Sequence, residues 1–257
     1  MLSKYNATRA LELQEQCSRI DTERSAVCDT GPVPTQPTRA QARIRQIETI
    51  KSTSRRLLAV HGAAGLSLRE VAREMGLVSS AIYRYFSTRD ELLTALIVDA
   101  YNDLGAAVER AVGRCEDDPR VQLHAAAVAI RRWAQRHPHE YALIFGSPVP
   151  GYEAPQFTID AATRVTTVLA GIVSAAWRGR GHDASAGTGL GAMLEQANLE
   201  AAMPGVPALT RARALMVWSA IFGLVSFELF GHFRGSVRNA SSFFDLAVDE
   251  LADLVLS

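Results

Sequence analysis

The sequence lacks most of the features that mark redox proteins, metalloproteins and membrane proteins. Its 257 residues include three cysteines, Cys17, Cys28 and Cys115, which form neither a CxxC pair nor a metal-binding spacing. The longest uncharged apolar run, residues 214–227, is shorter than the roughly 18 residues of a membrane span. The first residues show no apolar segment typical of a signal peptide. We therefore expect a cytoplasmic protein that needs no membrane.

Enzyme signatures are also missing. The sequence contains neither a Gly-x-Ser-x-Gly elbow nor a phosphate-binding Walker loop. The glycine-rich residues 187–192 are not preceded by a recognisable strand, so they do not predict a dinucleotide site. His137 and His139 flank a proline and have no third ligand at helical spacing, which argues against zinc. We predict no enzyme activity, no cofactor and no metal.

Residues 65–93, by contrast, have the pattern of a helix-turn-helix. Ser67 precedes an apolar run and Glu70 follows three residues later, as in a capping box, so a helix is expected to begin at Leu68. Gly76 is expected to end this helix. The inward face repeats at helical spacing, with Leu68, Val71, Ala72 and Met75.

The second helix of this motif is predicted over residues 79–86 and is unlike a core helix. Ile82 and Phe86 face inward, while small, aromatic and basic side chains face outward: Ser79, Ser80, Tyr83, Arg84 and Tyr85. Small residues let a backbone approach base edges, and Tyr and Arg reach bases or phosphates. A further helix is expected to start after Ser87 or Thr88, with Arg89 placed for a phosphate. The alternative is an ordinary surface helical hairpin.

Charge favours the DNA-reading interpretation. Residues 39–89 carry ten basic side chains against three acidic ones, although the net charge of the whole chain is zero. Such polarity is typical of a domain that binds a polyanion. We expect Ser79, Ser80, Tyr83 and Arg84 at the major groove of double-stranded DNA. Ser67, Tyr85 and Arg89 are expected on phosphates, and Arg39, Arg43 or Arg45 is expected to track the backbone or the minor groove.

Residues 76–93 resemble the signature of the tetracycline-repressor (TetR) family of bacterial regulators. The helix expected at residues 38–61, the turn at 62–65, the capped Ser67 and the aromatic run ending at Arg89 fall where that family has them. Val78 departs from the pattern, because the family usually has Ser or Thr there to cap the reading helix. The resemblance implies an all-helical homodimer whose C-terminal domain binds a small molecule that releases DNA.

The rest of the chain is predicted to be helical. Residues 1–38 end in a proline-rich piece and are expected to be a flexible extension; residues 39–90 form the DNA-binding domain. Residues 91–257 form an effector-binding and dimerisation domain, in which residues 133–155 resemble the WHG-type C-terminal domain. Seven helices are expected there, over residues 91–113, 119–135, 138–145, 155–178, 189–201, 207–232 and 243–256.

Two groups of apolar residues in this domain suggest further sites. Aromatic and polar residues are proposed as walls of an effector pocket, although each is also a plausible core residue: Trp133, His137, Tyr141, Phe145, Phe157 and Trp177. The stripe proposed for the homodimer interface, or alternatively for the intrachain core, comprises Trp218, Phe222, Val225, Leu229 and Leu251. The sequence therefore predicts an effector-released repressor, with a constitutive architectural DNA-binding protein as the alternative.

Overall fold

The chain divides into two compact units, residues 1–44 and 45–257. The computed structural model describes residues 38–178, 190–191 and 199–257. In the first unit, the described residues 38–44 open helix α2 (Arg39–Gly65). The Thr38 hydroxyl accepts a hydrogen bond from the Gln41 amide at 3.2 Å, and the Gln41 side chain accepts one from the Thr38 amide at 2.9 Å. This reciprocal pair is a capping box that fixes the start of the helix.

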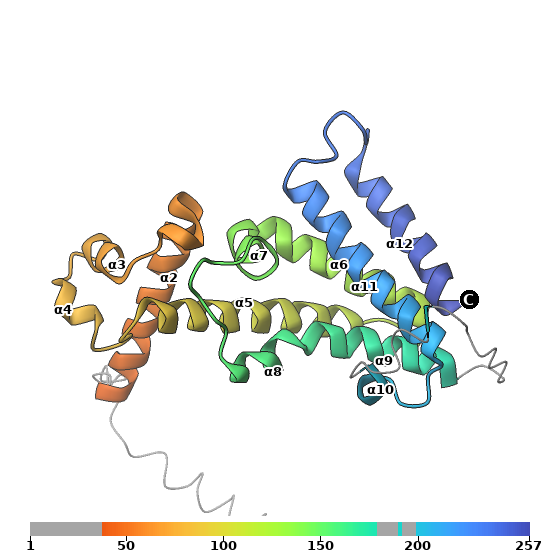
Figure 1. Cartoon of the computed structure of the whole chain (residues 1–257), viewed down its shortest axis with the longest axis horizontal. Coiled ribbons are helices and arrows are strands. Elements are labelled where there is room, and N and C mark those ends of the chain that lie inside the picture. Colours follow the sequence, from red (N-terminus) through yellow and green to blue (C-terminus); the bar gives the residue numbers. More distant parts are fainter. Residues whose placement is uncertain (1–37, 179–189, 192–198) are drawn as a thin grey trace, which may run out of the picture. The chain divides into compact units, whose positions relative to one another are not determined.

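The second unit begins with a helix-turn-helix region. It comprises the remainder of α2, α3 (Leu68–Glu74), α4 (Ser79–Ile82) and the first turns of α5 (Arg89–Val112) (Figure 1). α2 is interrupted at Gly62, whose φ of 65° is a left-handed conformation that favours glycine. These elements enclose a small core built from Ile50, Leu57, Leu58, Leu66, Leu68, Val71, Ala72, Ile82, Phe86, Leu92, Leu93 and Leu96.

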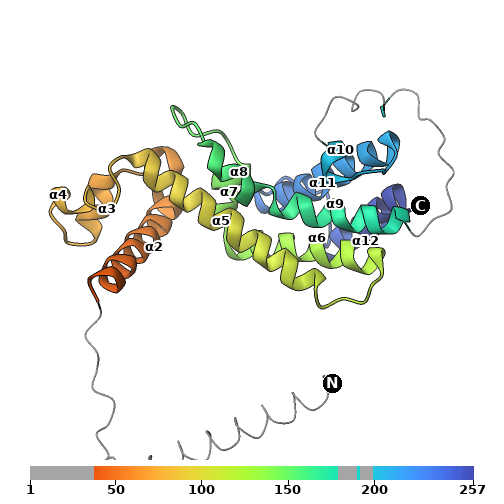
Figure 2. The ribbon, with the colours of Figure 1, turned by 90° about the horizontal axis from the view of Figure 1, so that it is seen from below.

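The remaining helices form a second and larger core. They are α6 (Pro119–Arg136), α7 (Pro138–Phe145), the short 3-10 helix η2 (Gln156–Thr158), α8 (Ile159–Ala162), α9 (Arg164–Arg178), α10 (Leu199–Ala202), α11 (Ala208–Leu229) and α12 (Ala240–Leu256). α5 runs beside α6 and α9, and α11 runs beside α12 (Figures 1 and 2). α5 contributes Leu92, Leu93 and Leu96 to the first core and Ala100, Leu104 and Val108 to the second.

The predicted all-helical fold class is confirmed. Most predicted helix bounds in the C-terminal region agree with the structure within a few residues. The single helix predicted over residues 155–178 is wrong, because the chain bends by 47° between η2–α8 and α9. The helix predicted over residues 189–201 lies mostly outside the described residues, as does the extension before Thr38. The domain boundary predicted after residue 90 falls inside α5.

α11 is a long and strongly apolar helix. By length and composition it meets the criteria for a membrane-spanning helix, with a mean hydropathy of 1.5, and so does the bent pair of η2–α8 with α9. However, α11 carries Arg211 and Arg213 in its first two turns and packs against α6, α9 and α12. Helices that line the core of a helical protein have the same composition.

Candidate DNA-binding interface and effector domain

The first helix of the helix-turn-helix begins at the predicted residue and has one half of the predicted capping box. Ser67 precedes α3, and its hydroxyl oxygen accepts a hydrogen bond from the Glu70 amide at 3.2 Å. The Glu70 carboxylate contacts His61 at 3.2 Å and Arg73 at 3.4 Å, so it does not close the second half of the capping box. Gly76 has a φ of 65°, and the chain turns there toward α4. A residue with a Cβ would be strained at this position.

α4 presents an exposed polar surface on a buried anchor. Ile82 is fully buried and Phe86 nearly so, and both belong to the first core. Ser79, Ser80, Tyr83 and Arg84 are exposed, with Tyr83 at 45%. The helix is one turn long rather than the predicted two, and turns continue it to Tyr85, which packs partly against the core.

The Val78 departure from the family pattern has a structural consequence. Val78 occupies the N-cap position of α4 and makes no capping hydrogen bond, so α4 begins at Ser79 without a side-chain cap. Neither Ser79 nor Ser80 supplies a capping hydrogen bond in its place. An uncapped helix start is less stable by roughly 1 kcal/mol.

Arg89 has a structural role that the sequence did not predict. Its guanidinium donates hydrogen bonds to the carbonyl oxygens of Leu66 at 2.9 Å, Ala63 at 2.8 Å and Ala64 at 3.4 Å. The last carbonyls of a helix have no partner within the helix and attract a positive charge. The sequence placed Arg89 on a DNA phosphate, whereas here its guanidinium is directed at the protein's own backbone at the end of α2.

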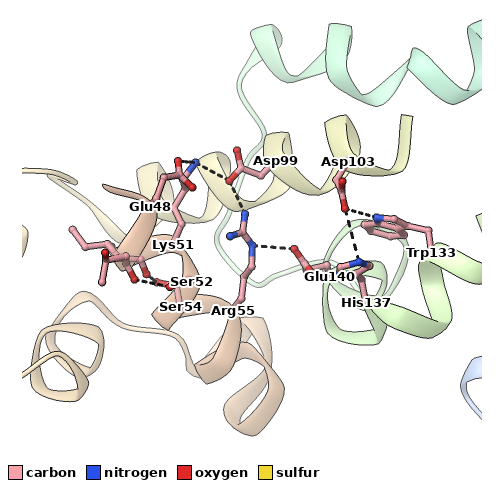
Figure 3. Close-up of polar contacts among 12 residues, drawn as sticks. Glu48, Lys51, Ser52, Ser54, Arg55, Asp99, Asp103, Trp133, His137 and Glu140 are labelled. Carbon is pink, nitrogen blue, oxygen red and sulfur yellow. Dashed lines mark hydrogen bonds and ion pairs between the residues drawn. The ribbon is translucent and has the colours of Figure 1, made fainter. Parts of the chain in front are cut away.

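A network of ion pairs links α2 to α5 and α7 (Figure 3). Arg55 donates to Asp99 of α5 at 2.7 Å and to Glu140 of α7 at 3.0 Å. Lys51, one helical turn earlier, contacts Asp99 at 2.8 Å and Glu48 at 2.6 Å. Burial alone would lower the pKa of Lys51, but its hydrogen bonds to Asp99 and Glu48 outweigh this effect and raise it. The helix-turn-helix region and the second core are therefore joined by charge as well as by α5.

The network continues on the α7 side (Figure 3). Glu140 also contacts the His137 Nδ1 at 2.9 Å. The His137 ring stacks on Trp133, with centroids 5.2 Å apart, and the Trp133 indole N–H donates to Asp103 at 2.8 Å. Trp133 and His137, predicted as pocket walls, thus help to attach α6 and α7 to α5.

Tyr141 and Phe145, also predicted as pocket walls, are packed against α11. The Tyr141 hydroxyl donates to the Phe222 carbonyl at 3.0 Å and lies 2.8 Å from the Ser226 hydroxyl. Burial raises the pKa of Tyr141 despite its bond to Ser226. Phe145 contacts the Phe222 ring at 4.4 Å between centroids.

An apolar cavity of about 510 Å³ lies among α6, α9, α10 and α11, and none of the six predicted pocket residues is among its described lining residues. Its walls include Leu123, Val173, Met203, Leu215 and Trp218. Phe157 lies elsewhere, 67% exposed in a groove with Glu91 and Glu153, and Trp177 packs against the second core. Trp218, predicted at the dimer interface, therefore faces this cavity.

The stripe predicted as a dimer interface is mainly intrachain core. Phe222 and Val225 are buried, and Leu229 packs partly against the same core. α11 and α12 also expose an apolar surface next to this stripe. Of the five residues predicted for the dimer interface, only Leu251 borders that surface. This α11–α12 groove of about 810 Å³ is lined by Ala220, Gly223, Leu224, Phe227, Phe233, Phe243, Leu246, Ala247, Glu250 and Leu251.

Comparison with known families matches both halves of the chain. Residues 50–96 match the model of bacterial regulatory proteins of the tetR family, and residues 123–251 match that of the tetracycline repressor-like C-terminal domain. The HTH-type transcriptional regulators Rv1816 of Mycobacterium tuberculosis and Mb1846 of Mycobacterium bovis are each 42% identical over 196 residues. The alignments cover 73% of this chain and 82% of each relative.

Solved structures agree with these matches. SCO4313, a protein assigned as regulatory, is 33% identical to this chain, and the two structures superpose with a TM-score of 0.70. The match covers 84% of this chain and 98% of SCO4313. The TetR family transcriptional regulator PfmR from Thermus thermophilus is 18% identical with a TM-score of 0.52, over 79% and 96%, and shares the fold.

Proposed function

The chain belongs to the tetracycline-repressor (TetR) family of HTH-type transcriptional regulators, which are not enzymes, and from this premise we propose an effector-released repressor. In this proposal a homodimer binds a pseudo-palindromic operator, and a small apolar effector bound in the C-terminal region releases it. The observation that carries the proposal is the exposed surface of α4 and of the turn that follows it, which presents Ser79, Ser80, Tyr83 and Arg84 above the buried Ile82 and Phe86. The protein would act in the cytoplasm.

The proposed readout separates base contacts from phosphate contacts. Tyr83 and Arg84 follow α4 at the exposed end of the motif, where they reach base edges in the major groove. Ser67 and Tyr85 are proposed on phosphates, and Arg43 and Arg45, both exposed, track the backbone or minor groove. Arg89 is no longer proposed as a phosphate contact, because its guanidinium donates hydrogen bonds to backbone carbonyls at the end of α2.

We predict that Arg84→Ala relaxes sequence preference and lowers operator affinity about 10-fold to 100-fold, as expected for loss of one base contact. The operator is first selected from random DNA by the wild-type protein, and gel shifts then compare it with scrambled DNA. Arg110→Ala is the matched control, because Arg110 is exposed on α5 and the charge change is identical. Equal losses for both variants, or for both DNAs, would contradict base reading by Arg84.

For the homodimer we propose the α11–α12 groove as the interface. It is apolar and lies open on the chain, and an exposed patch of this kind marks an association surface. Two copies related by a two-fold axis would form a four-helix arrangement from their α11 and α12 helices. This assignment accounts for the apolar composition of α11 without a membrane.

The Arg55 network is proposed to transmit the effector signal. Movement of α7 changes the geometry at Glu140, and Arg55 passes the change to α2, while Asp99 holds the same guanidinium from α5. Because α2 carries part of the first core, its displacement changes the position of α4. The resemblance of residues 133–155 to a WHG-type domain stays a proposal, supported by the stacked Trp133 and His137.

A double-mutant cycle tests the coupling. We predict that Arg55→Gln and Glu140→Gln interact by about 1–2 kcal/mol in urea unfolding, because their side chains are 31% and 17% exposed. The matched control pair is Arg56 and Glu74, which is 68% and 51% exposed with a 3.5 Å contact, and it should give no more than about 0.5 kcal/mol. If the effects of Arg55→Gln and Glu140→Gln on unfolding are additive, the Arg55–Glu140 pair is not energetically coupled and would not transmit the effector signal.

A further inference from the structure

The cavity among α6, α9, α10 and α11 has walls that suit the body of an apolar ligand. Its volume of about 510 Å³ lies within the roughly 300–1,000 Å³ typical of small-molecule sites. Leu123, Val173, Met203 and Trp218 supply apolar surface. A sugar or another polyol would lose its hydrogen bonds to water on entering such a site.

Three threonines also line the cavity, but their hydroxyl protons are already used. Thr163 donates to the Ile159 carbonyl at 2.9 Å, and Thr166 and Thr167 both donate to the Thr163 carbonyl, at 2.8 and 2.9 Å. Each of these bonds lies within one helical turn. The threonines therefore offer the ligand methyl groups and weak acceptors rather than donors.

A buried charge, Arg211, lies one helical turn before the first cavity residues of α11, although it is not itself one of the lining residues. Arg211 is only 7% exposed, and it lies on the face of α11 that carries the cavity residues Ala214, Leu215 and Trp218, because residues three, four and seven positions apart share a helix face.

Arg211 is only partly satisfied. Its partner is Glu200, which is 60% exposed and lies on the four-residue helix α10 between the cavity residues Leu199 and Ala201. Within the described parts of the chain, the Arg211 Nε atom makes no hydrogen bond. Guanidinium has five N–H donors in a fixed fork, and burying it without a full set of acceptors is costly.

We propose that this cavity binds an amphipathic carboxylate, whose apolar body fills the space among the four helices and whose carboxylate pairs with Arg211 in place of Glu200. A carboxylate matches the guanidinium fork with two parallel hydrogen bonds. Glu200, already largely in solvent, is displaced into water at little cost. The inference rests on the proposed effector role of the domain and specifies the chemical class of the effector.

The test compares three probes of equal chain length, decanoate, 1-decanol and decyltrimethylammonium, below their micelle-forming concentrations. Binding to the wild-type protein is measured without DNA by calorimetry and by intrinsic tryptophan fluorescence, to which Trp218 in the cavity wall contributes. We expect decanoate to bind at least 10-fold more tightly than decanol, and the cation to bind most weakly. Equal affinity for decanoate and decanol, or no binding of any probe, overturns the proposal.

Variants assign the selectivity to Arg211. Arg211→Met is expected to lower decanoate affinity about 10-fold to 100-fold and to leave decanol unchanged, whereas the control Arg213→Met changes neither. Glu200→Gln is expected to raise decanoate affinity, because it removes the carboxylate that competes for Arg211. This variant tests the pairing of decanoate with Arg211 even if Arg211→Met does not fold. An unchanged or lower decanoate affinity in Glu200→Gln contradicts the displacement.

The proposed release mechanism is measured separately, by operator gel shifts with and without decanoate. Selective binding of decanoate without operator release would support the site and refute its role in release. Release by decanol as effective as release by decanoate would support an effector-released repressor and refute the carboxylate class.

Discussion

Leu246→Asp is expected to give a folded monomer whose operator affinity is lower by about 100-fold or more. Leu246 is 67% exposed in the single chain, so the aspartate remains hydrated and the fold is preserved. In the proposed dimer the same carboxylate would be buried without a partner, which costs several kcal/mol. A monomer engages only one half-site, and the gain from two linked contacts, typically 10²- to 10⁴-fold, is lost.

Light scattering and gel shifts measure both effects on the same preparation. Ile159→Asp provides the control, because Ile159 is also an exposed aliphatic residue, at 45%, but lies on α8 away from the groove. Phe222→Asp is unsuitable for this purpose, because Phe222 is buried in the chain's own core and the variant would unfold. A Leu246→Asp protein that remains dimeric would exclude the α11–α12 groove as the interface.

Arg89→Met is expected to destabilise the helix-turn-helix region by about 3 kcal/mol, since hydrogen bonds to a charged donor contribute about 1.5–3 kcal/mol each and Arg89 makes several. Operator binding would fall for every sequence because the reading surface loses its support. Urea unfolding followed by circular dichroism measures the stability loss.

Arg73→Met is the matched control, because Arg73 is 81% exposed in the same region and its contact with Glu70 is weak. We expect it to change stability by less than about 0.5 kcal/mol. If Arg89→Met retained wild-type stability and only flattened the salt dependence of binding, Arg89 would be a phosphate contact after all.

The sequence predicted the parts of the fold that depend on neighbouring residues. The cap at Ser67, the turn at Gly76 and the buried anchors of the reading helix follow from side-chain spacing and glycine's freedom, which are local properties. The bend before α9 was missed because residues 155–178 keep a continuous apolar pattern across it. The spacing of apolar residues does not encode such a bend.

The contacts between segments that lie far apart in the sequence could not be predicted from it. Arg55 and Glu140 are 85 positions apart, and each also reads as an ordinary surface charge. The predicted pocket walls were selected because their side chains are aromatic, but an aromatic side chain can line a cavity or fill a core equally well. The sequence also identifies an apolar stripe on α11, but which side of it packs inside the chain and which side remains open depends on the placement of α12.

α5 links these regions mechanically. Its 24 residues form one rod of about 36 Å, and its two ends belong to different hydrophobic cores. A tilt of about 5° around one end would displace the other by about 3 Å, close to the rise of two residues along a helix. A tilt produced by a small rearrangement around Ala100, Leu104 and Val108 would therefore become a displacement of several ångströms at the far end of α5.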